Sequence, residues 1–276
     1  MTETTKTIDI LLLGSGGREH ALAKKLAESP RCGTLYIAPG NGGTLQEGVN
    51  VALAEDEPEA VAAFAREEGI GLVVIGPEAP LVAGVADAVR AAGIACFGPG
   101  AEGAQMEGSK RFSKELMERA GIPTAAYGSF TDEEAALAYV REQGAPLVVK
   151  ADGLAAGKGV VVATEQGQAE EAVRECFAGA FGDAGSTVVI EECLTGPECS
   201  LLAFTDGKTV RPMATAQDHK RALEGDRGPN TGGMGVYSPV PIVTDEELAV
   251  MKQVMVDTVA ELAAEGIDYR GCLYGG

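Results

Sequence analysis

Two lysines and three glycines lie close together near the middle of the chain, in the run KADGLAAGKGVVV at 150–162. Glycine permits positive φ and close backbone approach, so the N–H groups of such a loop can surround phosphate oxygens. Lys150 and Lys158 flank most of the loop and can neutralise phosphate charge. An ordinary hairpin with two solvated lysines needs only one or two of these glycines. The run therefore predicts a phosphate-binding loop, with backbone contributed by Gly153, Gly157 and Gly159.

This loop differs from a Walker A loop in its spacing. Gly153 and Gly157 are separated by three residues rather than four, and Gly159 stands where Ser or Thr should follow the lysine. A strand is expected on each side of the loop, whereas a Walker A loop opens a helix. A glycine loop between two strands resembles the triphosphate lid of the ATP-grasp superfamily.

A second glycine run, LLLGSGGREH, ends the first expected strand and opens a helix. Gly14, Gly16 and Gly17 would let an anion reach the N-terminal amides of that helix. A dinucleotide-binding fingerprint fails here, because Glu19 replaces its third glycine and residues 38–40, Ala-Pro-Gly, replace the acidic residue after the second strand. The run favours a single phosphate, and a plain strand–helix turn is the alternative.

Polar residues follow two more expected strands. Asn41 lies in PGNGGT at 39–44, and Glu78 lies in GPEAPL at 76–81. Ligands of α/β proteins bind at the carboxyl ends of parallel strands, so both side chains are candidates for hydrogen bonds to sugar hydroxyls or an amine. Polar turn residues are an equally good interpretation of each segment taken alone.

Two later segments complete the candidate site. In VVIEECLTGPECS at 188–200, a strand leaves into a short linker whose backbone can bond an adenine edge, and Glu198 can bond ribose hydroxyls. The segment 216–239 is too polar and glycine-rich for a core, and loops of this length are usually functional. Asp218, His219, Lys220 and Arg221 cluster there. His219 is either a catalytic base or an orienting hydrogen-bonding group.

The elements that must position these residues alternate between strand and helix over 8–97. Apolar strands alternating with amphipathic helices predict a parallel sheet covered on both faces. The expected strands are 8–14, 34–38, 71–76 and 94–98, and the expected helices are 17–29, 57–69 and 80–93. A helix over 108–121 and a small α+β unit over 124–194 should follow. The remaining expectations are strands near 198–206 and 209–215, a loop over 217–238, a helix over 245–266 and a strand at 272–274.

Composition narrows the function classes. The chain has 276 residues, long enough for two or three packed units, and a net charge of −19 that argues against nucleic-acid and anionic-membrane partners. No run of 18 apolar residues predicts a transmembrane helix, and no signal peptide is recognisable. The six cysteines have no zinc-finger or C-x-x-C spacing, so we expect reduced, structural thiols and a cytoplasmic location.

Taken together, these segments resemble the phosphoribosylamine–glycine ligase family of the ATP-grasp superfamily. The matching text is LLLGSGGREHALA, APGNGGT, VVIGPEAPLVAG, GSKRFSKELM, KADGLAAGKGVVVA, IEECLTGPECS, AQDHKRALEGDRGPNTGGMGVYSP and YRGCLY, in the family's order over essentially the whole chain. The resemblance implies an α/β fold in which a Rossmann-like parallel-sheet domain precedes an ATP-grasp α+β module. Its implied parts are an N-terminal domain at 1–106, a central domain at 107–123 and 195–276, and an ATP lid at 124–194.

The implied reaction joins glycine to 5-phosphoribosylamine through a glycyl phosphate made with ATP. The implied cofactors are ATP and Mg²⁺, or Mn²⁺ in its place, and the implied oligomeric state is a monomer. The implied catalytic residues are Lys150, Asp218, His219 and Lys220. The implied nucleotide-binding residues are Lys110, Lys150, Gly153, Gly157, Lys158, Gly159, Glu191, Glu192, Leu194 and Glu198. The implied substrate-binding residues are Gly14, Gly16, Gly17, Arg18, Asn41, Glu78, Asn230, Gly232 and Gly233.

The sequence departs from the family at its end, because the family's magnesium ligands, a Glu and an Asn, follow the segment YRGCLY. We expect a truncated chain with no metal ligands of its own and little or no turnover, whose last strand is followed by no further turn or strand. Two other functions stay open: another ATP-grasp ligase with a different acid or amine, and a module that binds a nucleotide or phosphosugar without catalysis.

Overall fold

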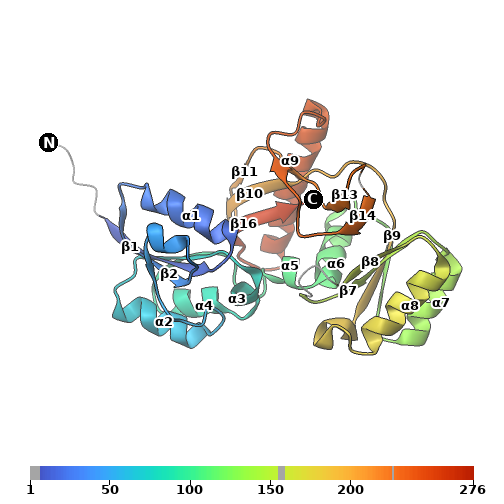
Figure 1. The fold of residues 1–276 in the computed structure, drawn as a ribbon, viewed down its shortest axis with the longest axis horizontal. Coiled ribbons are helices and arrows are strands. Elements are labelled where there is room, and N and C mark those ends of the chain that lie inside the picture. Colours follow the sequence, from blue (N-terminus) through green and yellow to red (C-terminus); the bar gives the residue numbers. More distant parts are fainter. Residues whose placement is uncertain (1–6, 155–158, 226) are drawn as a thin grey trace. The chain divides into compact units, whose positions relative to one another are not determined.

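The computed structural model describes residues 7–154, 159–225 and 227–276 (Figure 1). The chain divides into two compact units. The first comprises Met1–Ala104 and Ile267–Gly271, and the second comprises Gln105–Gly266 and Cys272–Gly276. The finer division into a central domain and a lid remains a prediction.

The first unit is built on a parallel sheet, as the strand–helix alternation predicts. Its strand order is β3-β2-β1-β4-β5, and every neighbouring pair is parallel. The strands are β1 (Ile8–Gly14), β2 (Cys32–Pro39), β3 (Val49–Asn50), β4 (Leu72–Ile75) and β5 (Ala95–Phe97). The helices are α1 (Gly17–Ala27), α2 (Pro58–Glu67), α3 (Glu78–Val82) and α4 (Val85–Ala91), with a 3-10 turn η1 (Thr44–Gln46).

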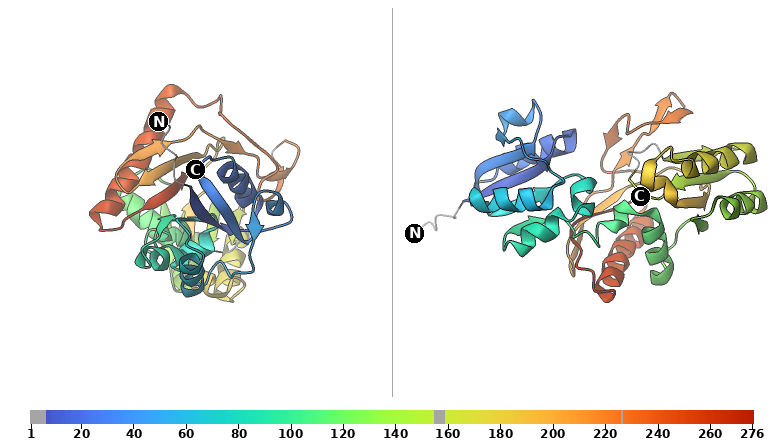
Figure 2. Two further views of the ribbon diagram at one scale, coloured as in Figure 1. Left: turned by 90° about the vertical axis from the view of Figure 1, so that its left-hand side faces the viewer. Right: turned by 90° about the horizontal axis from the view of Figure 1, so that it is seen from below.

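The side chains of β1 alternate between the two faces of the sheet, so this unit has an apolar core on each face. Leu11 and Leu13 pack in one cluster with residues of α2 and α4 such as Val61 and Val89. Leu12 packs in the other cluster, with residues of α1 such as Ala23. Because side chains alternate along a strand, an apolar run buries both faces. Figures 1 and 2 show α1 on one side of the sheet and α2 with α4 on the other.

One expected helix of this unit is wrong in extent. The segment 80–93, predicted as a single helix, is split between α3 and α4, and α3 begins earlier, at Glu78. Gly84 separates the two helices with a left-handed φ of 87°. That conformation is costly for other residues and easy for glycine, so it ends one helix and allows the next to begin.

The second unit begins with two helices, α5 (Gln105–Gly108) and α6 (Lys110–Ala120). The Ser109 hydroxyl caps α6 by accepting the Phe112 N–H, and Gly121 ends the helix with a left-handed φ of 65°. A four-stranded antiparallel sheet follows, in the order β6-β9-β7-β8. Its strands are β6 (Tyr127–Phe130), β7 (Leu147–Ala151), β8 (Val160–Ala163) and β9 (Val188–Glu192).

Two helices, α7 (Glu133–Gln143) and α8 (Gln166–Phe177), cover one face of this sheet. Val149 of β7 and Ile190 of β9 pack in the core beneath them, and these two residues are partners in the strand register. Their neighbours Lys150 and Glu191 therefore point to the opposite face. A short 3-10 segment, η2 (Gly182–Ser186), precedes β9.

A three-stranded sheet has the order β11-β10-β16; β10 and β11 belong to the second unit, as does β16 from Cys272 onward. Its strands are β10 (Leu201–Asp206), β11 (Val210–Pro212) and β16 (Arg270–Gly275), and the helix is α9 (Asp245–Ala264). The last strand, β16, pairs with β10 and lies at one edge of this sheet. Within the described part of the chain, no helix is long and apolar enough to cross a bilayer.

The segment 217–238 is not a plain loop. It contains two short antiparallel ladders, formed by β12 with β15 and by β13 with β14. Their bounds are β12 (Gln217–Asp218), β13 (Arg221–Leu223), β14 (Arg227–Asn230) and β15 (Val236–Tyr237). Backbone hydrogen bonding sets these strands without an apolar core, which explains why hydropathy gave no signal of them.

Candidate active site

Three lysines gather on the face of the four-stranded sheet that α7 and α8 leave uncovered. Lys150 comes from β7, and Lys110 and Lys114 come from one face of α6. The Lys150 ammonium donates a hydrogen bond to the Glu191 carboxylate at 2.9 Å. The electrostatic influence of Lys150 and Glu191 extends to both α6 lysines, so the four groups form one charged cluster.

Lys114 is the member that sequence reasoning missed. Its ammonium lies 3.3 Å from the same Glu191 oxygen that Lys150 contacts, and both side chains of this Lys114–Glu191 pair are 8% exposed. Burial lowers the pKa of Lys114, and the Glu191 carboxylate partly offsets that effect. The signal available in the sequence was its position four residues after Lys110, which places both lysines on one face of a helix.

Lys110 contacts the start of the glycine loop directly. Its ammonium donates to the carbonyl oxygens of Asp152 and Gly153, at 3.3 and 3.1 Å. The Asp152 carboxylate in turn accepts the Ser109 hydroxyl and the Arg111 N–H, so it binds the first turn of α6. Burial lowers the pKa of Lys110, and Asp152 acts in the opposite direction. This loop base is therefore tied to α6 by a half-buried cation and a capping carboxylate.

The predicted hinge and the polar segment 217–238 meet through one ion pair. The Lys220 ammonium lies 3.3 Å from the Glu198 carboxylate, and both side chains are more than one-third exposed. Burial acts to lower the pKa of Lys220, but Glu198 and other nearby anionic groups outweigh it and raise that pKa. Leu194, between β9 and Glu198, exposes 67% of its surface.

His219 is fixed by its backbone and by a ring contact. Its N–H donates to the Gly235 carbonyl at 2.9 Å, and its own carbonyl accepts the Met234 N–H at 2.7 Å. Its ring stacks on Tyr237, with centroids 5.8 Å apart. Among the described residues its hydrogen bonds are those of the backbone, which favours neither role proposed for its imidazole.

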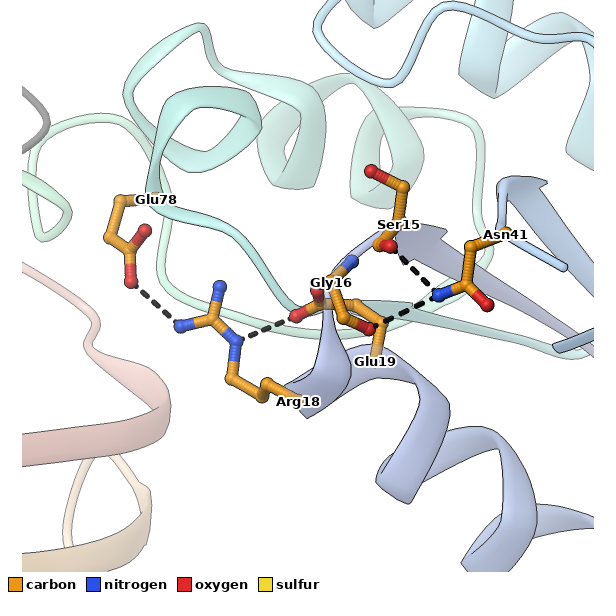
Figure 3. A network of polar contacts seen from close by, with 6 residues as sticks. All are labelled: Ser15, Gly16, Arg18, Glu19, Asn41 and Glu78. Carbon is orange, nitrogen blue, oxygen red and sulfur yellow. Dashed lines mark hydrogen bonds and ion pairs between the residues drawn. The ribbon is translucent and has the colours of Figure 1, made fainter. Parts of the chain in front are cut away.

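The glycine run of the first unit holds a carboxylate of its own (Figure 3). Glu19, 3% exposed, folds back under the loop and accepts the Gly16 N–H at 2.9 Å. A Cβ added to Gly14 would lie 2.3 Å from Glu19 Cγ, and one added to Gly76 would lie 2.2 Å from Glu19 Oε1. The two glycines therefore make the space that Glu19 occupies. One amide at the start of α1 is consequently already bonded to a negative charge.

Arg18 bridges two carboxylates at this loop. Its Nε donates to Glu19 at 2.6 Å and its Nη1 donates to Glu78 at 2.8 Å, as Figure 3 shows. Burial acts to raise the pKa of Glu78, but Arg18 outweighs it and holds that pKa below its usual value. The structure thus brings together two of the predicted substrate-binding side chains, Arg18 and Glu78, as a half-exposed ion pair.

Asn41 joins the second polar turn to the glycine run. Its side-chain amide donates to the Ser15 carbonyl at 2.8 Å, and its side-chain oxygen accepts the Gly43 N–H at 2.7 Å. The Asn41 amide nitrogen is drawn toward Ser15 and Gly16 in Figure 3. This arrangement supports the polar-turn interpretation of Asn41 and leaves its sugar-binding role a prediction.

Several predicted residues remain without a tested role. Gly157 and Lys158 lie outside the described residues, and Asn230 is placed only by its backbone in β14. Glu192 accepts the Ala126 N–H at 3.4 Å. Gly232 and Gly233 lie in the turn between the two short ladders, where the Gly233 N–H donates to the Thr231 hydroxyl. Asp218 lies in β12, and Gly17 opens α1.

The sequence predicted no metal ligands within this chain, and that remains a prediction. Within the part of the chain that the structure describes, no three His, Cys, Asp or Glu residues are grouped so that they could hold a metal ion. Lys110 and Lys150 offer the cationic N–H donors that a phosphate needs, whereas a metal ion needs anionic or neutral donor atoms. No ligand role for Mg²⁺ is assigned to residues of this chain.

Two family models match the chain almost end to end. The model for phosphoribosylglycinamide synthetase, N domain, matches residues 8–107, and the model for phosphoribosylglycinamide synthetase, ATP-grasp (A) domain, matches residues 108–276. Among curated proteins, a phosphoribosylamine–glycine ligase of Allochromatium vinosum is 59% identical over 271 residues, covering 97% of this chain and 63% of that relative. One from Yersinia pestis is 57% identical, covering 98% of this chain and 64% of the relative.

Solved structures of other proteins share the fold of this chain. A crystal structure of a phosphoribosylamine–glycine ligase from Thermotoga maritima superposes with a TM-score of 0.83 at 31% identity, covering 97% of this chain and 64% of that one. The biotin carboxylase domain of a Hydrogenobacter thermophilus 2-oxoglutarate carboxylase has a TM-score of 0.74 at 18% identity, which shows a shared fold. The chain spans about two-thirds or less of the length of the curated relatives named here.

Proposed function

Because the chain belongs to the phosphoribosylglycinamide synthetase family, we propose that the protein ligates glycine to 5-phosphoribosylamine with the consumption of ATP. The observation that carries the proposal is the lysine cluster beside the glycine loop. Lys110 and Lys150 lie within one charged group, and Lys110 contacts the loop base. The chain as a whole carries a net charge of −19, so phosphate binding requires cations to be concentrated locally, as they are here.

In the proposed reaction, Lys110 and Lys150 bind the nucleotide phosphates and reduce their negative charge. ATP supplies a phosphoryl group that activates the glycine carboxylate, and the amine of phosphoribosylamine then attacks the activated carbonyl and displaces phosphate. Such a transfer depends on positioning and charge neutralisation more than on a protein nucleophile. The glycine loop serves to exclude water, which protects the activated carboxylate from hydrolysis.

We assign the glycine run of the first unit to the phosphoribosyl substrate. Gly14, Gly16, Gly17 and Arg18 surround the start of α1, where amides and a guanidinium are available to a phosphate. Glu19 already bonds one of these amides. A single phosphate would therefore bind the amides at the start of α1 that Glu19 does not occupy. Arg18 would bind the phosphate after it releases one of its two carboxylate partners, Glu19 or Glu78. Glu78 and Asn41 are proposed to contact the sugar.

The activity is tested by release of ADP from the protein at its natural length, with glycine and phosphoribosylamine supplied together and each omitted in turn. ADP release that requires both substrates supports the ligase. ADP release that requires a different acid or amine identifies another ATP-grasp ligase, and ligand binding without turnover identifies a binding module.

Lys150→Met tests the nucleotide site separately, by calorimetric titration with ATP. A hydrogen bond to a charged group is worth roughly 1.5–3 kcal/mol, so affinity should fall about 10- to 100-fold. Lys208→Met is the matched control, because Lys208 is an exposed lysine on the turn after β10 and undergoes the same charge change. Equal losses in both variants would contradict the assignment.

Titration with NAD and with glycinamide ribonucleotide tests the first unit, and tight binding of NAD alone would contradict the phosphosugar assignment.

A further inference from the structure

Lys114 is a buried cation without an evident ligand of its own. A lysine ammonium has three N–H donors. Those of Lys114 face the Thr124 hydroxyl at 2.8 Å, the Ala125 carbonyl at 3.2 Å and the Glu191 carboxylate at 3.3 Å. Its ammonium also lies 5.5 Å from the centre of the Tyr127 ring. With every donor directed at protein, Lys114 has none left for a phosphate.

Lys150 differs from Lys114 in that it is more exposed and has N–H donors that are not bonded to the protein. Its side chain is 26% exposed, compared with 8% for Lys114. Among the described residues its ammonium has one hydrogen-bond acceptor, Glu191, so two of its three donors remain for other groups. Lys150 can therefore contact an anionic ligand while it stays bonded to the sheet.

Glu191 links the two lysines through a single oxygen. Both ammonium groups approach its Oε2 atom, at 2.9 Å from Lys150 and 3.3 Å from Lys114, and the carboxylate side chain is 8% exposed. If Lys150 were the only cation beside this carboxylate, the pair would be neutral. With Lys114 present, the three groups together carry one net positive charge, which is available at the more exposed lysine.

We propose that Lys114 is a positioning residue that holds and neutralises the Glu191 carboxylate, so that the ammonium of Lys150 can direct its two free N–H donors to an anionic nucleotide. The proposal rests on the proposed function, since it takes ATP as the ligand of Lys150. Burial keeps Lys114 out of contact with a ligand. Its hydrogen bonds to Thr124 and Ala125, just before β6, hold the Lys114 ammonium in place beside the Glu191 carboxylate.

The proposal predicts a specific pattern of coupling. In Lys114→Met, the Glu191 carboxylate has lost one of its two cations, so it binds Lys150 more strongly and competes with the nucleotide. The dissociation constant for ATP should rise about tenfold, which corresponds to about 1.4 kcal/mol. In a Lys150→Met background the same substitution should change that constant less than about twofold, because the residue through which Lys114 acts is absent.

Removing the carboxylate gives an independent check. In Lys114→Met with Glu191→Gln, no anion remains to hold Lys150, so ATP affinity should return to within about twofold of the Glu191→Gln value. A purely structural role would instead make the losses multiply in both double variants. Thermal melting of each variant is recorded beside the titrations, and Lys208→Met again controls for net charge. Lys114→Gln, which keeps a donor for Thr124, replaces Lys114→Met if the latter does not fold.

The outcomes separate this inference from the function on which it rests. No ATP binding by the wild-type protein, or no effect of Lys150→Met, would overturn the proposed nucleotide site and this inference together. ATP binding that depends on Lys150 but changes less than twofold in Lys114→Met would overturn the inference alone. Losses that multiply in the Lys114→Met, Lys150→Met double variant would also overturn it. A tenfold loss that disappears in both double variants would support it.

Discussion

Glu19→Ala should destabilise the first unit by about 3–5 kcal/mol. The carboxylate is 3% exposed and accepts the Gly16 N–H at 2.9 Å. Leaving that amide without its partner costs about 1–3 kcal/mol. Removing the buried stem between Gly14 and Gly76 leaves a cavity, which adds on the order of 2 kcal/mol for a side chain of this size. The bond from Arg18 adds little, since that guanidinium is half exposed.

The assay is hydrogen–deuterium exchange of peptides covering β1 and β4, because the chain has two units and a single unfolding midpoint would mix them. A loss of 3 kcal/mol should speed exchange in these strands about 100-fold. Glu19→Gln keeps the volume and should cost about 1–2 kcal/mol, since one hydrogen bond is replaced by a mismatched donor. Glu59→Ala, an exposed glutamate in the first turn of α2, is the matched control.

Exchange in Glu19→Ala within about threefold of the wild type would refute this reasoning, because it would mean that the Glu19 carboxylate contributes little to the stability of the loop. An equal increase in the second unit would refute it as well, since the contacts of Glu19 all lie within the first unit.

Three further predictions follow from particular contacts. Gly76→Ala should destabilise the first unit by about 2 kcal/mol or more, because its Cβ would lie 2.2 Å from Glu19 Oε1, and in a Glu19→Ala background it should be nearly neutral by the same exchange assay. Hydrogen bonds from Arg141, Gln166 and Arg174 lower the pKa of Glu170 to about 2, so its contribution to stability is present above the usual pKa of 4.5 and is lost as the pH falls toward 2. Glu170→Gln should therefore make the stability of the protein less dependent on pH between these values, and an unchanged acid-unfolding curve would contradict this prediction. Burial raises the pKa of the Cys96 thiol to about 11, so Cys96 should resist alkylation at pH 8 in the native protein and react in denaturant, with labelled peptides counted by mass spectrometry; fast native labelling would show that the thiol is accessible.

Much of the fold was predictable because the decisive signals are local. Apolar strands such as Ile8–Gly14 alternate with amphipathic helices, and that period requires a parallel sheet with helices on both faces. The helix expected over 108–121 corresponds to α6, which ends at Gly121 as the sequence indicated. The errors also had local causes, since the break at Gly84 depends on one backbone conformation and the ladders of 217–238 depend on hydrogen bonds without an apolar pattern.

The sequence by itself determined which residue types are available for chemistry: the two glycine runs, the lysines beside them and the polar segment 217–238. Only the tertiary structure decided which of these groups meet. Glu19 lies between Gly14 and Gly76, and Glu191 lies against Lys114 and Lys150, because strands and helices distant in the chain pack at fixed positions. A pattern of residue types reports periodicity and turn chemistry, which are properties of neighbours in sequence. The partner of a buried charge is set by packing between distant segments, and no spacing along the chain encodes it.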